Sequence, residues 1–397
     1  MPDAKFIPPQ QNPLLVRLIQ SFFFLVAYFA FKFRLIVSEA DLTKVRAIAN
    51  QRVVYLPNHS NLDDGMVMFQ LSARIGQLFH YIVAVEAFRG AIGNLLQTVG
   101  AYSIRRGVGD RSSIVQTIKL LQQPQSKLVI FPEGGCSYQN DTVIPFRTGA
   151  VELSFKAMSK IVKQEKIVPD FYLVPVTLKY CYPNATALDV SQAIASLETA
   201  LGISSEQKDN YYRLRAIAQH LLDSLEAEYH VVPAVETDWN QRLGLLRQQM
   251  LHYCEAKLEL TSNNQLRDRE RVYKVQAFLR NLAESERDPL INYDHLYLTT
   301  VRLLNFDAIY DGYVAEKPTP ERFFATIDRF EREVFKIDQA KPKGVRQIIT
   351  TISTPINLKD YWQEYQQQSD SLVERLTTMA QQEVQQNLTQ CKCSSNP

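Results

Sequence analysis

The sequence predicts an α/β fold in which a mostly parallel central sheet is flanked by helices, with a large all-helical region attached. Between Arg52 and Tyr180, short apolar runs alternate with helical patterns, as in βαβ crossovers. From Asn184 to about Lys343, apolar residues recur only at helical spacing. With 397 residues, 46% of them hydrophobic, the chain has material for the cores of two or three domains.

The strands of the predicted sheet are short apolar runs that end at polar turns. The first, third and fourth of them lead directly into NHSNLDD, RRG and PEGGCS. Because ligands bind beyond the carboxyl ends of parallel strands, these three turns are the expected site. The predicted strands are Arg52–Pro57, Tyr81–Val85, Ala101–Ile104, Lys127–Phe131 and Phe171–Tyr180, with helices over 65–75, 88–99, 112–123 and 149–161.

The N-terminal segment is aromatic and carries no acidic residue from Ala4 to Ser38, whereas Lys5, Arg17, Lys32 and Arg34 are basic. Fourteen uncharged residues separate Arg17 from Lys32. As a helix they span about 21 Å, less than the roughly 30 Å of a bilayer core, so spanning would require the basic side chains to snorkel. We expect residues 1–38 to form a membrane-associating helix that is either half-embedded in the bilayer or spans it. The alternatives are a buried core helix and a signal peptide.

Charge and cysteine content exclude several classes of protein. A net charge of +2 without a long basic run argues against nucleic-acid binding. The five cysteines show neither metal-ligand spacing nor a disulfide framework, which favours a reducing compartment, and Cys391 and Cys393 lie in an expected disordered tail, 391–397. The charged run at 267–274 is typical of a solvated helix face.

His59 and Asp64 are the candidate catalytic pair, separated by His-x-x-x-x-Asp at a strand-to-helix turn. A carboxylate that holds one imidazole nitrogen leaves the other to accept a hydroxyl proton, although Asp64 could instead cap the following helix. Arg105 and Arg106 could bind phosphate or form a solvated strand end. Glu133 could bind a hydroxyl beside glycines that admit a ligand, or belong to a plain tight turn.

In order, these clusters resemble the motifs of the glycerolipid acyltransferase superfamily, which includes bacterial lysophosphatidate and glycerol-3-phosphate acyltransferases. The four matches, in chain order, are Asn58, His59 and Asp64; GAYSIRRG from Gly100 to Gly107; Phe131, Pro132, Glu133 and Gly134 with the linked Pro145, Phe146 and Gly149; and Val174, Pro175 and Val176. Many members have Thr-Arg after Phe-Pro-Glu-Gly, whereas this chain has Gly135 and Cys136. The difference removes one positive charge near the acceptor and leaves the identity of the acceptor open. Arg147, in the following turn, could restore that charge.

The resemblance implies an O-acyltransferase at the cytoplasmic face of a membrane, acting in phospholipid biosynthesis. His59, oriented by Asp64, would deprotonate the hydroxyl of a glycerol-3-phosphate-type or lysophospholipid acceptor. That hydroxyl would attack an acyl-CoA or acyl carrier protein thioester, with no metal or other cofactor. The acceptor-binding residues implied are Arg106 first, then Arg105, with Glu133, Gly134, Gly135 and Arg147, supported by Asn58, Pro132 and Pro175.

The predicted domain plan places residues 39–183 in the acyltransferase core and 184–343 in a helical insertion. Val345–Ser353 is β-branched, and Ser353-Thr354-Pro355-Ile356 looks like the closing element of shorter family members, so 344–390 is expected to return to the core. The alternative is an independent C-terminal helical domain.

Two other functions compete with acyl transfer. One is hydrolysis or transfer through the thiol of Cys136, which follows Glu133 by three residues on the same turn. The absence of a Gly-x-Ser-x-Gly elbow argues against an ordinary serine hydrolase. The other is lipid binding by the same fold without catalysis.

Overall fold

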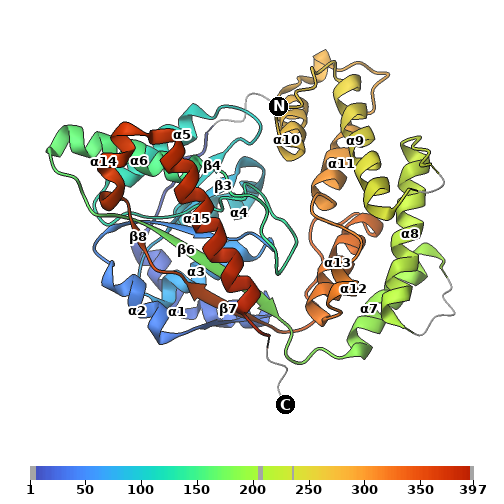
Figure 1. Cartoon of the computed structure of the whole chain (residues 1–397), viewed down its shortest axis with the longest axis horizontal. Helices are drawn as coiled ribbons and strands as arrows, with labels where there is room; N and C mark the ends of the chain where they lie inside the picture. Colours follow the sequence, from blue (N-terminus) through green and yellow to red (C-terminus); the bar gives the residue numbers. More distant parts are fainter. Residues whose placement is uncertain (1–5, 204–208, 235–236, 394–397) are drawn as a thin grey trace. The chain divides into compact units, whose positions relative to one another are not determined.

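The computed structural model describes residues 6–203, 209–234 and 237–393 (Figure 1). The described chain divides into two compact units. The sheet unit contains residues 6–105, 110–183 and 344–393, and the helical unit contains Asn184–Lys343 together with Arg106–Gly109. Lys5 lies outside the described residues.

A mostly parallel sheet forms the centre of the sheet unit, with strand order β1-β7-β6-β2-β5-β3-β4. The antiparallel pairs are β6 with β7 and β6 with β8. Because β7 lies between β1 and β6, the chain returns to this sheet after the helical unit. The strands are β1 (Phe33–Val37), β2 (Arg52–Pro57), β3 (His80–Ala84), β4 (Ala101–Ile104), β5 (Lys127–Val129), β6 (Phe171–Cys181), β7 (Arg346–Ile352) and β8 (Ile356–Asn357).

Helices cover both faces of the sheet, so there is a hydrophobic core on each side of it. Successive side chains of β2 point to opposite faces: Val53 and Tyr55 belong to the first core, and Val54 and Leu56 belong to the second. The first core packs under α1 (Pro13–Phe29), α2 (Glu39–Ala47), α3 (Asp64–Arg74) and α4 (Gly90–Thr98). The second packs under α5 (Arg111–Gln122), α6 (Gly149–Glu165), α14 (Trp362–Gln367) and α15 (Ser369–Gln390). This is the α/β architecture that the alternating pattern predicted.

The helical unit is built from amphipathic helices. The Thr186 side chain and Asp189 form a capping box that begins α7, and Asp209 and Asp238 cap the next two helices. Its helices are α7 (Ala187–Leu201), α8 (Asn210–Glu228), α9 (Trp239–Lys257), α10 (Asp268–Asn281), α11 (Tyr293–Asn305), α12 (Tyr313–Glu316) and α13 (Pro320–Val334).

The N-terminal segment differs from the single helix expected over residues 1–38. The helix α1 begins after the Asn12 cap and ends at Phe29, and residues 33–37 form the strand β1, which pairs in parallel with β7. Among the described residues, no helix combines the length and the apolar character that crossing a membrane requires. One side of α1 packs on the sheet unit through Val16, Phe23 and Ala27.

Two further expectations are wrong. Cys181 and Cys393 form a disulfide, with Cα atoms 5.4 Å apart, so residue 393 of the expected disordered tail is bonded to the end of β6. Residues 394–397 lie outside the described chain. In the charged run, Arg269 and Arg271 are buried rather than solvated, because Asp307 and Glu255 from neighbouring parts of the helical unit pair with them.

Candidate active site

The predicted site residues follow strands of the same parallel sheet. His59 lies two residues beyond β2, Arg105 directly follows β4, and Glu133 lies four residues beyond β5. Since β2, β5, β3 and β4 are parallel neighbours in that order, their carboxyl ends share one edge of the sheet. The fold therefore carries His59, Arg105 and Glu133 at one edge of the sheet.

The imidazole of His59 is held through one ring nitrogen. His59 Nδ1 donates to Asp64 Oδ2 over 2.9 Å, and the backbone N–H of Asn61 donates to the same oxygen. The ring lies against Phe131, with centroids 4.4 Å apart. Asp64 is fully buried at the start of α3, whereas the His59 side chain is 19% exposed. Fixing Nδ1 in this way makes Nε2 the nitrogen that can accept a proton from a ligand.

A buried polar network behind this pair was missed by the sequence analysis. Tyr180 Oη at the end of β6 donates to Asp64 Oδ1 over 2.6 Å. The guanidinium of Arg346, on β7, lies 5.2 Å from the Tyr180 ring centroid and donates to Asp63 over 2.6 Å. Burial, followed by the neighbouring Asp64 carboxylate, raises the pKa of Tyr180 well above its ordinary value, so its hydroxyl remains a donor.

One signal in the sequence could have suggested this network. An arginine begins the β-branched run 346–352, a position where a charged side chain is expensive to bury unless it is paired. The partner could not be read from the sequence, because Asp63 and Arg346 are 283 positions apart.

Glu133 ties its own turn to the backbone of His59. Its buried carboxylate accepts the backbone N–H of His59 at 2.5 Å and that of Ile144 at 3.1 Å. The carbonyl of His59 in turn accepts the backbone N–H of Ser137 at 2.7 Å. These bonds fix the position of His59 relative to the PEGG turn. Glu133 therefore holds the backbone of the site in place, a role that differs from the binding of a ligand hydroxyl that the sequence predicted.

Arg147 lies directly over Gly134. Its backbone N–H donates to the carbonyl of Pro132 over 2.8 Å, and a Cβ added to Gly134 would stand 2.5 Å from Arg147 Nε. Gly134 also has φ +72°, a conformation that favours glycine. The arginine within Pro-Phe-x-x-Gly, the second part of the motif, is thus held against the glycine turn, where it supplies positive charge.

The two arginines after β4 have different surroundings. Arg105 Nε lies 3.5 Å from Asp110, which also accepts the Arg105 backbone N–H, and both residues belong to the sheet unit. Arg106 belongs to the helical unit, where its guanidinium lies 4.6 Å from the ring centroid of Tyr273 and donates to the tyrosine hydroxyl over 3.2 Å. The backbone of Gly107 approaches that of Tyr273 so closely that a Cβ would overlap it.

The remaining predicted residues shape the backbone. The amide of Asn58 accepts the Leu178 backbone N–H at 2.7 Å and donates to the Leu178 carbonyl at 3.0 Å, which joins the turn after β2 to β6. Pro175 lies opposite Leu56 in the β2–β6 pairing. Gly135 precedes Cys136, which is half-buried and is not in a disulfide.

Part of the chain matches a known protein family. Residues 37–179 match the family described as Acyltransferase, and the match includes all four motifs and every predicted site residue. It covers just over a third of the chain. No curated protein matches the chain.

Proposed function

Because residues 37–179 belong to the acyltransferase family, as the resemblance of the four motifs indicated, we propose that this protein transfers a fatty acyl group from a thioester to an acceptor hydroxyl. The acceptor we propose is a glycerol-3-phosphate-type molecule or a lysophospholipid, and the donor an acyl-CoA or acyl carrier protein thioester. The observation that carries the proposal is the His59–Asp64 pair, with Nδ1 held by a fully buried carboxylate.

The chemistry follows from that geometry. Nε2 of His59 takes the proton of the acceptor hydroxyl as its oxygen attacks the thioester carbonyl, and Asp64 stabilises the imidazolium that forms. When the tetrahedral intermediate collapses, the C–S bond breaks and the thiolate takes the proton from His59. The products are an ester and a free thiol, and neither metal nor redox cofactor takes part in these steps.

Binding of the acceptor is assigned to the residues around the glycine turn. Arg147 lies over Gly134, in the turn that Glu133 ties to His59. We assign Arg147, together with Arg105 and Arg106, to binding the phosphate of the acceptor. The missing side chain of Gly134 makes room for the Arg147 guanidinium beside the ligand, and Gly135 is our choice for close approach of the ligand to the backbone. Replacing Arg147 by Gln should raise the KM for a phosphate-bearing acceptor while the KM for an uncharged monoacylglycerol stays unchanged.

Attachment to the cytoplasmic face of a membrane is the second part of the proposal. The side chains of Leu14, Leu18, Phe22, Leu25 and Phe29 are exposed on α1 at spacings of three and four residues, so they form one apolar stripe. No acidic residue accompanies them, while Arg17 belongs to the same helix and Lys32 and Arg34 follow it. An apolar stripe with basic residues nearby suits an anionic bilayer surface, with the helix lying in the interface.

Thiol release tests the catalytic proposal. Purified protein with acyl-CoA and a panel of acceptors should release free thiol, and His59→Ala should lower the rate by about 10²- to 10⁴-fold. His220→Ala, an exposed histidine of the helical unit, is the matched control and should keep full activity. Full activity of His59→Ala would refute the assignment.

The same assay separates the competing functions. Loss of thiol release in Cys136→Ser, with His59→Ala active, would favour the Cys136 hydrolase. Lipid capture without turnover by any acceptor would favour a non-catalytic lipid-binding protein.

A further inference from the structure

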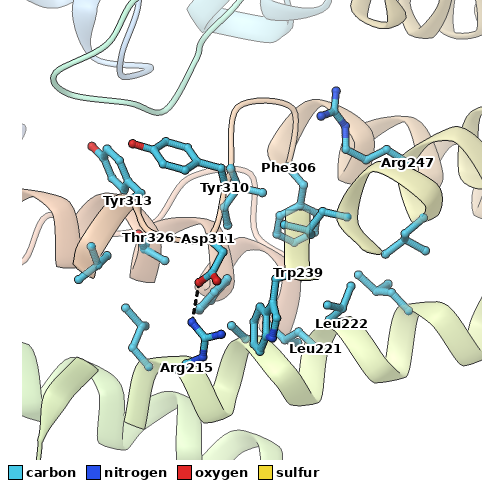
Figure 2. Close-up of a pocket in the computed structure, with 18 of the residues that line it drawn as sticks. Arg215, Leu221, Leu222, Trp239, Arg247, Phe306, Tyr310, Asp311, Tyr313 and Thr326 are labelled. Carbon is cyan, nitrogen blue, oxygen red and sulfur yellow. Dashed lines mark hydrogen bonds and ion pairs between the residues drawn. The ribbon is translucent and has the colours of Figure 1, made fainter. Parts of the chain in front are cut away.

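The helical unit encloses an apolar cavity that the proposed catalysis does not use. It has a volume of about 100 Å³ and lies between α8, α9, the end of α11 and the α12–α13 region. Its lining includes leucines of α8 and α9 and the rings of Phe306 and Phe330. Figure 2 shows Leu221 and Leu222 on one side of the cavity and Phe306 on another. All of the lining belongs to the helical unit.

The cavity has a polar rim. Arg215 pairs with Asp311 over 2.6 Å and lies 4.3 Å from the ring centroid of Trp239. Figure 2 shows this ion pair beside the indole, at the margin of the leucine-lined interior. Tyr310 is exposed and Trp239 half-buried, so the cavity opens to solvent beside them.

The charged groups of the lining already have partners within the protein. Arg215 pairs with Asp311, Arg247 with Asp307, and Arg302 with Glu333. The hydroxyl of Thr326 donates to the carbonyl of Arg322. A polar ligand would therefore have to break an existing pair to bind, whereas an apolar ligand gains from contact with the leucines and phenylalanines.

We propose that this cavity binds the hydrocarbon end of a fatty acyl chain, while the rest of the chain and its polar end extend past the paired Arg215 and Asp311 into solvent. The size agrees with this ligand, because an apolar cavity of about 150 Å³ admits benzene and a cavity of about 100 Å³ admits the last few carbons of a chain. The choice of an acyl chain rests on the proposed function, whose substrates carry one. None of the residues that line the cavity is among those assigned to catalysis or to acceptor binding.

Trp239 provides an internal reporter, because the chain has only two tryptophans and the other, Trp362, belongs to the sheet unit. In a Trp362→Phe background, Trp239 is the only tryptophan. Dibromostearate should quench its emission saturably, since bromine quenches on contact, and unlabelled stearate should restore the emission by competition.

A cavity-filling variant and a matched control locate the ligand. Ala218→Phe places a ring inside the cavity and should weaken stearate binding at least tenfold. Ser224→Phe adds the same ring on the exposed side of the same helix and should change nothing. If circular dichroism shows that Ala218→Phe does not fold, the Trp362→Phe protein still tests the proposal. Restoration of the Trp239 emission by unlabelled stearate would support a saturable site beside Trp239, and its absence would refute one.

Quenching that rises linearly with dibromostearate, or that Ala218→Phe leaves unchanged, would overturn the proposal. The result is independent of catalysis, because His59→Ala should quench as the parent protein does. Absent quenching with normal thiol release refutes only the cavity site. Saturable quenching with no thiol release for any acceptor refutes only the proposed function.

Discussion

Replacing Tyr180 by Phe tests whether the network behind His59 positions the proposed catalytic pair, His59 and Asp64. The change removes one hydroxyl, which donates to Asp64 over 2.6 Å, and keeps the ring that lies against Arg346. Both Tyr180 and Asp64 are buried, so water does not replace the lost donor without rearrangement. The variant therefore isolates one hydrogen bond to the carboxylate that holds His59.

The expected magnitude follows from the kind of bond. A hydrogen bond to a charged group contributes about 1.5–3 kcal/mol, so the free energy of unfolding should fall by about that amount. If part of the bond energy holds Asp64 in place for His59, the rate of thiol release should fall about tenfold, since about 1.4 kcal/mol corresponds to a factor of ten. Because burial raises the pKa of Tyr180 well above its ordinary value, the rate deficit should be the same at every pH from about 6 to 9.

The matched control is Tyr102→Phe, a second buried tyrosine. Its hydroxyl shares a 2.7 Å hydrogen bond with Thr117, so both partners are neutral and the loss of stability should be about 0.5–1.5 kcal/mol. Thiol release should be that of the parent protein. Urea unfolding followed by circular dichroism and the thiol assay measure the two quantities. Equal rates for Tyr180→Phe and Tyr102→Phe would refute the reasoning.

Four further expectations concern other parts of the molecule. Arg346→Met breaks a buried ion pair and should cost about 3–5 kcal/mol in urea unfolding, against about 0–1 kcal/mol for Arg375→Met, whose pair with Glu364 is exposed. Burial lowers the pKa of His80 from 6.5 to about 4, so the unfolded chain binds more protons than the folded protein between these pH values. The free energy of unfolding should therefore fall by about 3 kcal/mol as the pH drops from 6.5 to 4, and His80→Gln should remove this loss. Alkylation in denaturant without reductant should label three of the five cysteines, and alkylation in denaturant after reduction should label all five; five labels without reductant would exclude the Cys181–Cys393 bond. Leu18→Glu with Phe22→Glu should abolish co-sedimentation with anionic vesicles, while Ile167→Glu, an exposed residue beyond α6, should not.

The strands of the sheet were predictable because buried parallel strands are continuous apolar runs. Arg52–Pro57 and Ala101–Ile104 have the predicted bounds, and the others differ by a few residues, as where β5 ends at Val129 before the Phe-Pro turn. The strand β1 was missed because FRLIV directly follows an apolar helix. A run of five residues with alternating burial does not distinguish a strand from the end of an amphipathic helix until a partner strand is known.

Local chemistry explains why the His59–Asp64 pair was predictable from the sequence. His59 and Asp64 are five positions apart on one turn, so their contact depends on the local backbone, which the strand–turn–helix pattern already indicated. The ring contact with Phe131 and the bond from the His59 N–H to Glu133 depend on the pairing of β2 with β5, which only the sheet order provides.

By itself, the sequence determined the α/β pattern, the positions of the polar turns at strand ends and the four motifs, because each of these depends on residues close together in the chain. Only the tertiary structure decided that Tyr180 and Arg346 stand behind Asp64, that Cys393 reaches Cys181, and that the charges of Arg269 and Arg271 are buried. These contacts join residues from separate elements. Composition and spacing do not encode which distant carboxylate, ring or thiol a packed fold places within reach, and the energy of a buried charge depends on that partner.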